Sequence, residues 1–207
     1  MRIAFLVSLL FFSTLSQGQS AFRSFFRLSG PEKTWTLFHP FKAGRAWKIT
    51  KEARQQVAAH LHDAELDTFV HGGKIDAFRH AWWMARLTQR IGQRAALKLG
   101  KAHERGNYRQ FFKNRQEDGV IQDSTASVMD LRNNEAGALL AKKHPESTAD
   151  ELAILVIDLI RSGNLTILKR NLQGQLTTCD GMIVRMLVSG TRPWAFPYCL
   201  IRSDQTP

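Results

Sequence analysis

The sequence predicts a mainly α-helical fold, a single compact multi-helix domain that ends in a small β-hairpin and a tail held by a disulfide bond. Apolar residues recur at intervals of three and four through most of the chain, which is the spacing of one helix face. Prolines and glycines separate these segments at positions where helices begin or end. The pattern changes only after Gly163, where short runs flank turn residues instead.

The amino terminus has the pattern of a cleavable secretory signal. One positive charge, Arg2, precedes an apolar run over 3–12, and the small residues Ser16 and Gly18 suit signal peptidase. We expect cleavage between Gly18 and Gln19. The apolar run is shorter than the about 20 residues that a membrane span needs, so an uncleaved anchor is the lesser alternative.

Cleavage would leave 207 less 18, or 189 residues, which we expect to form one domain over 19–207 in the periplasm or outside the cell. The full chain has 29 Lys and Arg against 18 Asp and Glu, so loss of Arg2 leaves 28 minus 18, a net charge of +10. Such a charge favours an anionic envelope component or substrate as partner. The alternative interpretation is that these basic residues form a solvated surface without a specific partner. No specific nucleic-acid motif is present, because aromatic residues do not alternate with the basic ones.

The first helices are predicted from their end signals. Ser29 can cap a helix that has Pro31 in its first turn, and Pro40 separates it from the next. The following amphipathic stretch, over 41–61, precedes a loop at Gly72 and Gly73.

The strongest predicted helix runs from Ile75 to Ile91 and ends at Gly92, and another runs over 94–105. Ser124 is the expected cap of a helix that ends before Pro145.

A capping box of Thr148 and Glu151 opens the last helix, over 152–160, which is apolar almost all round and is expected in the core. Beyond Gly163, the runs 165–168 and 175–178 flank 171–174 and indicate a hairpin.

Two cysteines, Cys179 and Cys199, lie in the last thirty residues. Export would expose both to an oxidising compartment, so we expect a disulfide bond rather than two free thiols. Closing a loop of about 20 residues stabilises a fold by about 3 kcal/mol in the chain-entropy model.

Polar residues interrupt the apolar faces of three predicted helices. Asp76 and His80 are four residues apart and share a face, as do Asp130 and Asn134. The remaining polar candidates are Arg79, His103, Glu104 and Asn133. Buried charge is costly unless it is paired, so we expect these side chains to converge on one another or on a ligand.

Two interpretations of this cluster stay open. In the functional one, zinc or another divalent ion is bound by His80, His103, Asp76 and Asp130. Glu104 would be the base acting on a water, Arg79 would meet an anionic substrate group, and Asn134 or Asn133 would orient the ligands. In the structural one, Arg79 neutralises Asp76 or Asp130 and the groups form a hydrogen-bond network.

The functional interpretation implies a metal-dependent hydrolase acting on an envelope or other anionic substrate. The alternative is a binding or structural protein of the periplasm or exterior. Neither a G-x-S-x-G elbow nor a nucleotide-binding loop is present, so hydrolysis by an activated water is the chemistry that His, Asp and Glu can support.

Three sequence blocks resemble a bacterial domain family of unknown function that occurs in exported and toxin-like proteins. The blocks are DAFRHAWWMA from Asp76, GKAHE from Gly100 and MDLRNNEAG over 129–137. The resemblance extends to PEKTW from Pro31, to HPFK over 39–42 and to the two late cysteines. It implies that the family's matching positions here are Asp76, Arg79, His80, Trp83, His103, Glu104, Asp130, Asn133, Asn134 and Gly137. The toxin-like context favours an enzyme by analogy, because effector domains are commonly hydrolases.

Overall fold

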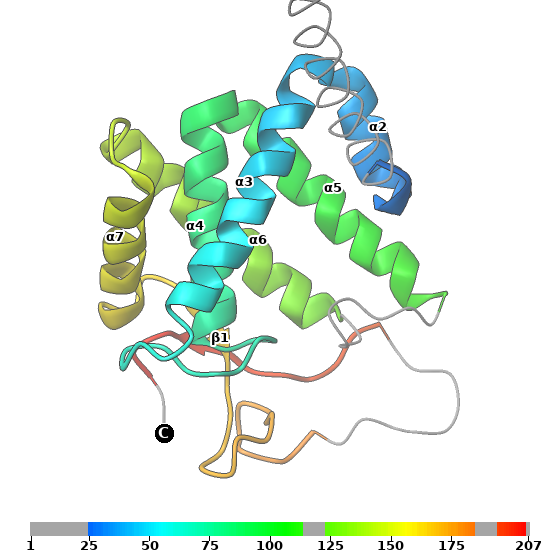
Figure 1. Cartoon of the computed structure of the whole chain (residues 1–207). Helices are drawn as coiled ribbons and strands as arrows, with labels where there is room; N and C mark the ends of the chain where they lie inside the picture. The colour runs from blue at the N-terminus through cyan, green and yellow to red at the C-terminus, as the bar shows by residue number, and fades with distance from the viewer. Residues whose placement is uncertain (1–24, 114–122, 185–193, 206–207) are drawn as a thin grey trace, which may run out of the picture.

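Helices α2 to α7 and a two-stranded sheet form the framework of the described residues (Figure 1). The computed structural model describes residues 25–113, 123–184 and 194–205, so the predicted signal over 1–18 lies outside them. The elements are α2 Gly30–Phe38, α3 Pro40–Ala59, α4 Lys74–Ile91, α5 Gln93–Phe111, α6 Ser124–Lys143, α7 Ala149–Arg161, β1 Thr166–Leu168 and β2 Leu200–Arg202. The mainly α prediction is confirmed.

The helix ends follow local capping chemistry. Ser29 and Glu32 form a capping box at α2, and the predicted capping box of Thr148 and Glu151 opens α7. Helix α6 departs from the prediction, because Asp123 and not Ser124 caps it by accepting from the two amides of 125 and 126. Asp, Ser and Thr follow one another here, and each is a good cap, so the pattern alone could not choose between them.

Helix α5 continues to Phe111, beyond the predicted end at Arg105. Gly106 lies inside this extension, and its missing side chain makes room for Ser29. A Cβ at Gly106 would lie 2.4 Å from the Ser29 hydroxyl oxygen. The extension therefore packs α5 against the start of α2.

Helix α4 is the centre of the fold and packs against α3, α5, α6 and α7 (Figure 1). Four of its large apolar side chains are completely buried, namely Phe78, Trp82, Met84 and Leu87. The Trp82 indole donates to the carbonyl oxygen of Ala149 and so joins α4 to the start of α7. Polar residues on the same helix are therefore surrounded by packed elements.

Helices α4 and α6 approach each other closely because Gly137 has no side chain. A Cβ at this position would lie 2.1 Å from the carbonyl oxygen of Ala81, on α4. Gly100 gives α5 a similar approach, since a Cβ there would lie 2.8 Å from the methyl carbon of Met84 and 3.0 Å from Asn134 Nδ2. Helix spacing depends on the side chains at the contact, so these glycines set the distances between the three helices.

The carboxyl-terminal segment forms a sheet as predicted, but with a different strand partner. Strand β1 pairs antiparallel with β2, with Ile167 opposite Ile201. The expected turn is present, because Asn171 and Gln175 are joined by a backbone hydrogen bond, but the run 175–178 contributes isolated bridges instead of a strand. The apolar run at the end of the chain takes the place of that strand beside β1.

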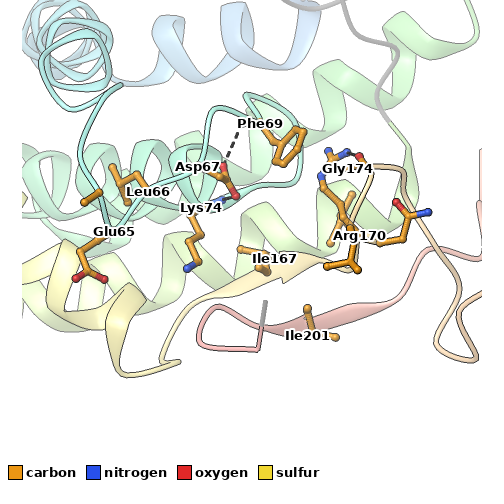
Figure 2. A pocket seen from close by; sticks show the side chains of 13 residues that line it. Glu65, Leu66, Asp67, Phe69, Lys74, Ile167, Arg170, Gly174 and Ile201 are labelled. Carbon is orange, nitrogen blue, oxygen red and sulfur yellow. Dashed lines mark hydrogen bonds between the residues drawn. The ribbon is translucent and has the colours of Figure 1, made fainter. Parts of the chain in front are cut away.

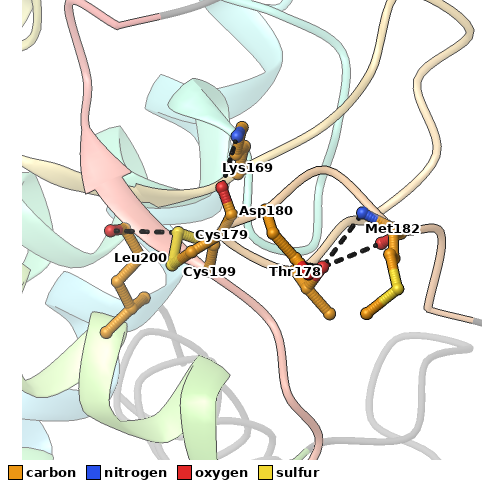
Figure 3. The surroundings of a disulfide bond; sticks show 7 residues. All are labelled: Lys169, Thr178, Cys179, Asp180, Met182, Cys199 and Leu200. Atoms are coloured by element: carbon orange, nitrogen blue, oxygen red, sulfur yellow. Dashed lines mark hydrogen bonds between the residues drawn. A yellow bond between two sulfur atoms is a disulfide. The ribbon is translucent and has the colours of Figure 1, made fainter.

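The predicted disulfide bond joins Cys179 to Cys199 (Figure 3). Backbone hydrogen bonds on both sides of Cys199, to Lys169 and Thr177, hold this part of the tail in the sheet region. The bond therefore connects the turn region to the strand that covers β1. Within the described ranges, no helix is both long and apolar enough to cross a membrane.

Substitution of Gly137 by alanine should destabilise the protein strongly. The new methyl group would overlap the Ala81 carbonyl oxygen, and separating α4 from α6 should lower the free energy of unfolding by about 2 kcal/mol or more. Gly44→Ala is the matched control, since Gly44 lies within α3 and nothing approaches its Cβ position within 4 Å. We expect this control to gain about 0.5 to 1 kcal/mol. Urea denaturation followed by circular dichroism measures both, and equal stabilities would contradict the proposed close crossing.

Candidate functional site

Three buried side chains of the types that bind metal ions converge where α4 meets α6, and we call them the three donors. Asp76 and His80 come from α4 and Asp130 comes from α6, and one donor atom of each lies within 4.8 Å of the others. The His80 Nε2 atom lies 3.6 Å from Asp76 Oδ1 and 3.4 Å from Asp130 Oδ1. Each residue is at most 3% exposed.

Helical spacing explains this convergence. Asp76 and His80 are one turn apart on α4, while Asp130 and Gly137 are two turns apart on α6 and so share a face. The face of α6 that meets Ala81 at Gly137 therefore also presents Asp130 to α4. The close crossing brings the two carboxylates and the imidazole together.

Asp76 is held as a charged carboxylate. Arg79 Nη2 donates to Asp76 Oδ1 at 2.6 Å, and the amide of Gly72 donates to Oδ2 at 2.7 Å. Burial acts to raise the pKa of Asp76, but the charges of Arg79 and His80 and the hydrogen bond from Gly72 outweigh it and lower the pKa. Both oxygens of this carboxylate are engaged.

Asp130 has the opposite electrostatic character. Burial, followed by the negative charges of Asp76 and Glu104, raises the pKa of the Asp130 carboxyl well above its usual value. Its Oδ1 atom has no hydrogen-bond partner among the described residues, and neither does the Oδ1 or Nδ2 atom of Asn134 one turn later on α6. Buried polar atoms normally have partners, so this side of the cluster has bonding capacity that the described residues do not use.

The His80 ring lies between the carboxylates of Asp76 and Asp130. Arg79 Nη2 lies 3.2 Å from His80 Nε2, and a guanidinium can only donate. A neutral ring protonated on Nδ1 would offer its Nε2 lone pair to this contact, whereas a protonated ring would donate from Nε2 to a carboxylate. That lone pair is also the one that a metal ion would use.

His103 and Glu104 border the cluster without joining the three donors. The ring centre of His103 lies 6.4 Å from that of His80, and His103 Nδ1 lies 3.0 Å from Glu32 Oε1 on α2. Burial acts to raise the pKa of Glu32, but the hydrogen bond with His103 and the charge of His103 outweigh burial and lower this pKa. The buried Glu104 accepts a 3.4 Å hydrogen bond from Asn107 and lies close enough to Asp130 to raise its pKa.

Asn133, which the sequence suggested as a residue that orients metal ligands, instead bonds to the backbone of β1. Its side-chain amide donates to the carbonyl oxygen of Thr166 at 2.9 Å and accepts from the amide of Thr166 at 2.8 Å. This pair of bonds joins α6 to β1. Asn134 differs from Asn133, because its side-chain atoms make no hydrogen bond within the described residues.

Sequence reasoning missed two residues near the cluster. Glu32 is the partner of His103, and only the PEKTW segment of the family resemblance pointed to it. His71 lies in the loop before α4, where its charge contributes to the lowered pKa of Asp76 and its Nε2 atom lies 3.7 Å from Asp123 Oδ2. No periodic pattern marks a loop histidine, so nothing in the sequence indicated it.

A surface cleft of about 300 Å³ lies elsewhere, between the loop before α4 and the carboxyl-terminal sheet (Figure 2). Two of its polar side chains, Asp67 and Arg170, make hydrogen bonds that hold the fold. Asp67 accepts from the amide of Lys74 at the start of α4, and Arg170 donates to the carbonyl oxygens of His71 and Gly174 while its guanidinium stacks on Phe69. None of the three donors lines this cleft. Beside the cluster, the side chains of Arg79 and His103 are partly exposed, at 26% and 23%.

Comparison with known proteins places the chain in one family. The model of the Domain of unknown function (DUF6973) matches residues 33–164, which is more than half of the chain and includes the three donors. Glu32, Cys179 and Cys199 lie outside the matched range. No curated protein and no solved structure matches the chain. The chain belongs to the DUF6973 family, whose domain has no known function.

Proposed function

We propose that the chain is a metal-dependent hydrolase whose metal ion is held by Asp76, His80 and Asp130. The observation that carries this proposal is the convergence of the three donors within 4.8 Å of one another. One imidazole with two carboxylates suits zinc or a similar transition ion. Burial and, after it, the charges of Asp76 and Glu104 raise the pKa of Asp130, and a cation at this position would favour the ionised carboxylate.

The neighbouring residues suit the other requirements of hydrolysis. A bound ion of this kind supplies a water of lowered pKa. Glu104 lies beside Asp130 and is the candidate base for that water, and Asn134 has amide atoms available to orient a ligand. Arg79 is the partly exposed cation at the edge of the cluster, where an anionic group of a substrate would meet it. In this arrangement His103 supports the edge through Glu32 instead of binding the ion.

Export and the substrate class are part of the same proposal. The basic charge of the chain favours an anionic substrate, and the signal-like amino terminus together with the disulfide bond supports action in the periplasm or outside the cell. An envelope polymer that carries acidic groups fits both conditions.

A structural role is the second candidate, and the 2.6 Å pair between Arg79 and Asp76 favours it. In that case Arg79 neutralises Asp76 without a metal, and the cluster serves to lock α4 to α6. The burial of the donors suits this role as well. The two candidates differ in metal content and in the effect of Asp130 on stability.

Metal binding should depend on the three donors. We expect the purified protein, loaded with zinc and dialysed, to retain about one equivalent, and His80→Ala and Asp130→Ala to retain less than about a tenth of it. His62→Ala is the control, since His62 is exposed, and it should bind as the parent does. Elemental analysis gives the stoichiometry. A parent that retains no zinc, cobalt or manganese would rule out the metal site, as would full retention in both donor variants.

Asp130→Asn should stabilise the metal-free protein at neutral pH. Because the folded state raises the pKa of Asp130, the unfolded chain loses this proton first as the pH rises above about 4, and the parent loses stability until the pH passes the raised pKa. Asparagine does not titrate, so the variant should exceed the parent by about 1 kcal/mol or more at pH 7 and lose this advantage near pH 4.

Urea denaturation across this pH range measures the difference. Asp158→Asn, at an exposed site of α7, should show little pH dependence relative to the parent. An Asp130→Asn variant that is less stable than the parent at pH 7 would support the structural role instead.

A further inference from the structure

The corner between α2 and α3 carries large apolar side chains that the fold leaves in solvent. Leu37, Phe38 and Phe41 are 69%, 79% and 94% exposed. The corner lies at the end of the molecule away from the β1–β2 sheet (Figure 1). Neighbouring apolar residues on a surface commonly mark a place of interaction.

Inward contacts of the same corner explain why these residues point outward. Trp35 is buried and donates to the carbonyl oxygen of Ala95, and the His39 ring stacks on Trp35 with 4.7 Å between ring centres. Helix α3 then begins at Pro40 and buries its opposite face through Ala46 and Ile49. The inner side of the corner therefore packs through Trp35, Ala46 and Ile49, and Leu37, Phe38 and Phe41 remain on the outer side.

The surroundings of the exposed residues are strongly basic. Between residues 26 and 51 the cations are Arg27, Lys33, Lys42, Arg45, Lys48 and Lys51. The only acidic residue in this stretch is Glu32, which pairs with His103. Arg45 and Lys48 follow Phe41 by four and seven residues, so all three lie on one exposed face of α3.

We propose that this corner docks on an anionic lipid bilayer. We define the lipid-docking corner as Leu37, Phe38, Phe41, Arg45 and Lys48. The apolar side chains would enter the boundary between head groups and acyl chains, and the two cations would meet lipid phosphates. Phenylalanine and leucine beside lysine and arginine are typical of helices that bind at a membrane surface without crossing it.

The geometry favours a bilayer over a protein partner. A stable protein interface needs about 800 Å² of fitted surface on each side, whereas a corner of two helices presents projecting side chains. A bilayer adapts around such projections, and its charge complements Arg45 and Lys48. Glu52, one turn after Lys48 on α3, is paired with Arg86 at 3.7 Å. This inference is independent of the metal site, because none of the docking residues belongs to the cluster.

Cosedimentation with vesicles tests the proposal. The probes are phosphatidylcholine vesicles with and without about one third phosphatidylglycerol, and the parent should bind the anionic vesicles about tenfold more tightly or better. Phe38→Ser combined with Phe41→Ser should weaken this binding about tenfold or more. Arg45→Glu combined with Lys48→Glu should weaken the binding by a similar factor. Both of these residues lie on α3 with Phe41. Thermal melting should show that both variants are folded.

Two controls separate the corner from general surface properties. Phe112→Ser removes an aromatic ring that is 61% exposed beyond α5, and Lys142→Glu combined with Lys143→Glu changes the net charge as much as the basic corner variant does. Both controls should bind vesicles as the parent does. The proposal is overturned if the parent does not bind anionic vesicles or if the controls lose as much binding as the corner variants. It is also overturned if the corner variants change only the oligomeric state in light scattering, because the corner would then join copies of the chain.

Discussion

The contact between Gly137 and the backbone of Ala81 decides how the rest of the molecule is arranged. Helix α4 is the common neighbour of the other long helices, and α6 can lie against it this closely only where no side chain intervenes. Two turns before Gly137, the same face of α6 carries Asp130. The spacing that suits a close helix contact therefore also places a carboxylate against His80 and Asp76.

Neighbouring groups compensate the burial of the Asp76 carboxylate more fully than the burial of the Asp130 carboxylate. Arg79 and the amide of Gly72 stabilise the ionised form of Asp76. Asp130 has a raised pKa, and within the described residues its Oδ1 atom makes no hydrogen bond, although His80 Nε2 lies 3.4 Å away. A network selected only for stability would be expected to satisfy both carboxylates. The asymmetry, together with the polar atoms of Asn134 that make no hydrogen bond within the described structure, supports a role for this side of the cluster in binding an ion.

Local sequence signals predicted the elements well, and they predicted part of the buried polar cluster. The one-turn spacing of Asp76 and His80 and of Asp130 and Asn134 identified the faces that meet, because helix periodicity is a local property. The pair of His103 and Glu32 joins residues 71 positions apart, and no periodicity encodes such a pair. The pairing of β1 with the end of the chain was missed for the same reason, since short apolar runs do not specify their partners.

The central claim is that the crossing of α4 and α6 builds a metal site, and diffraction from zinc-loaded crystals at the zinc absorption edge tests it most directly. We predict an anomalous peak about 2.0 to 2.2 Å from His80 Nε2 and from a carboxylate oxygen of Asp130, with Asp76 facing the same ion. Zinc bound only at other positions, with the 2.6 Å pair of Arg79 and Asp76 unchanged and no peak beside His80, would contradict the account.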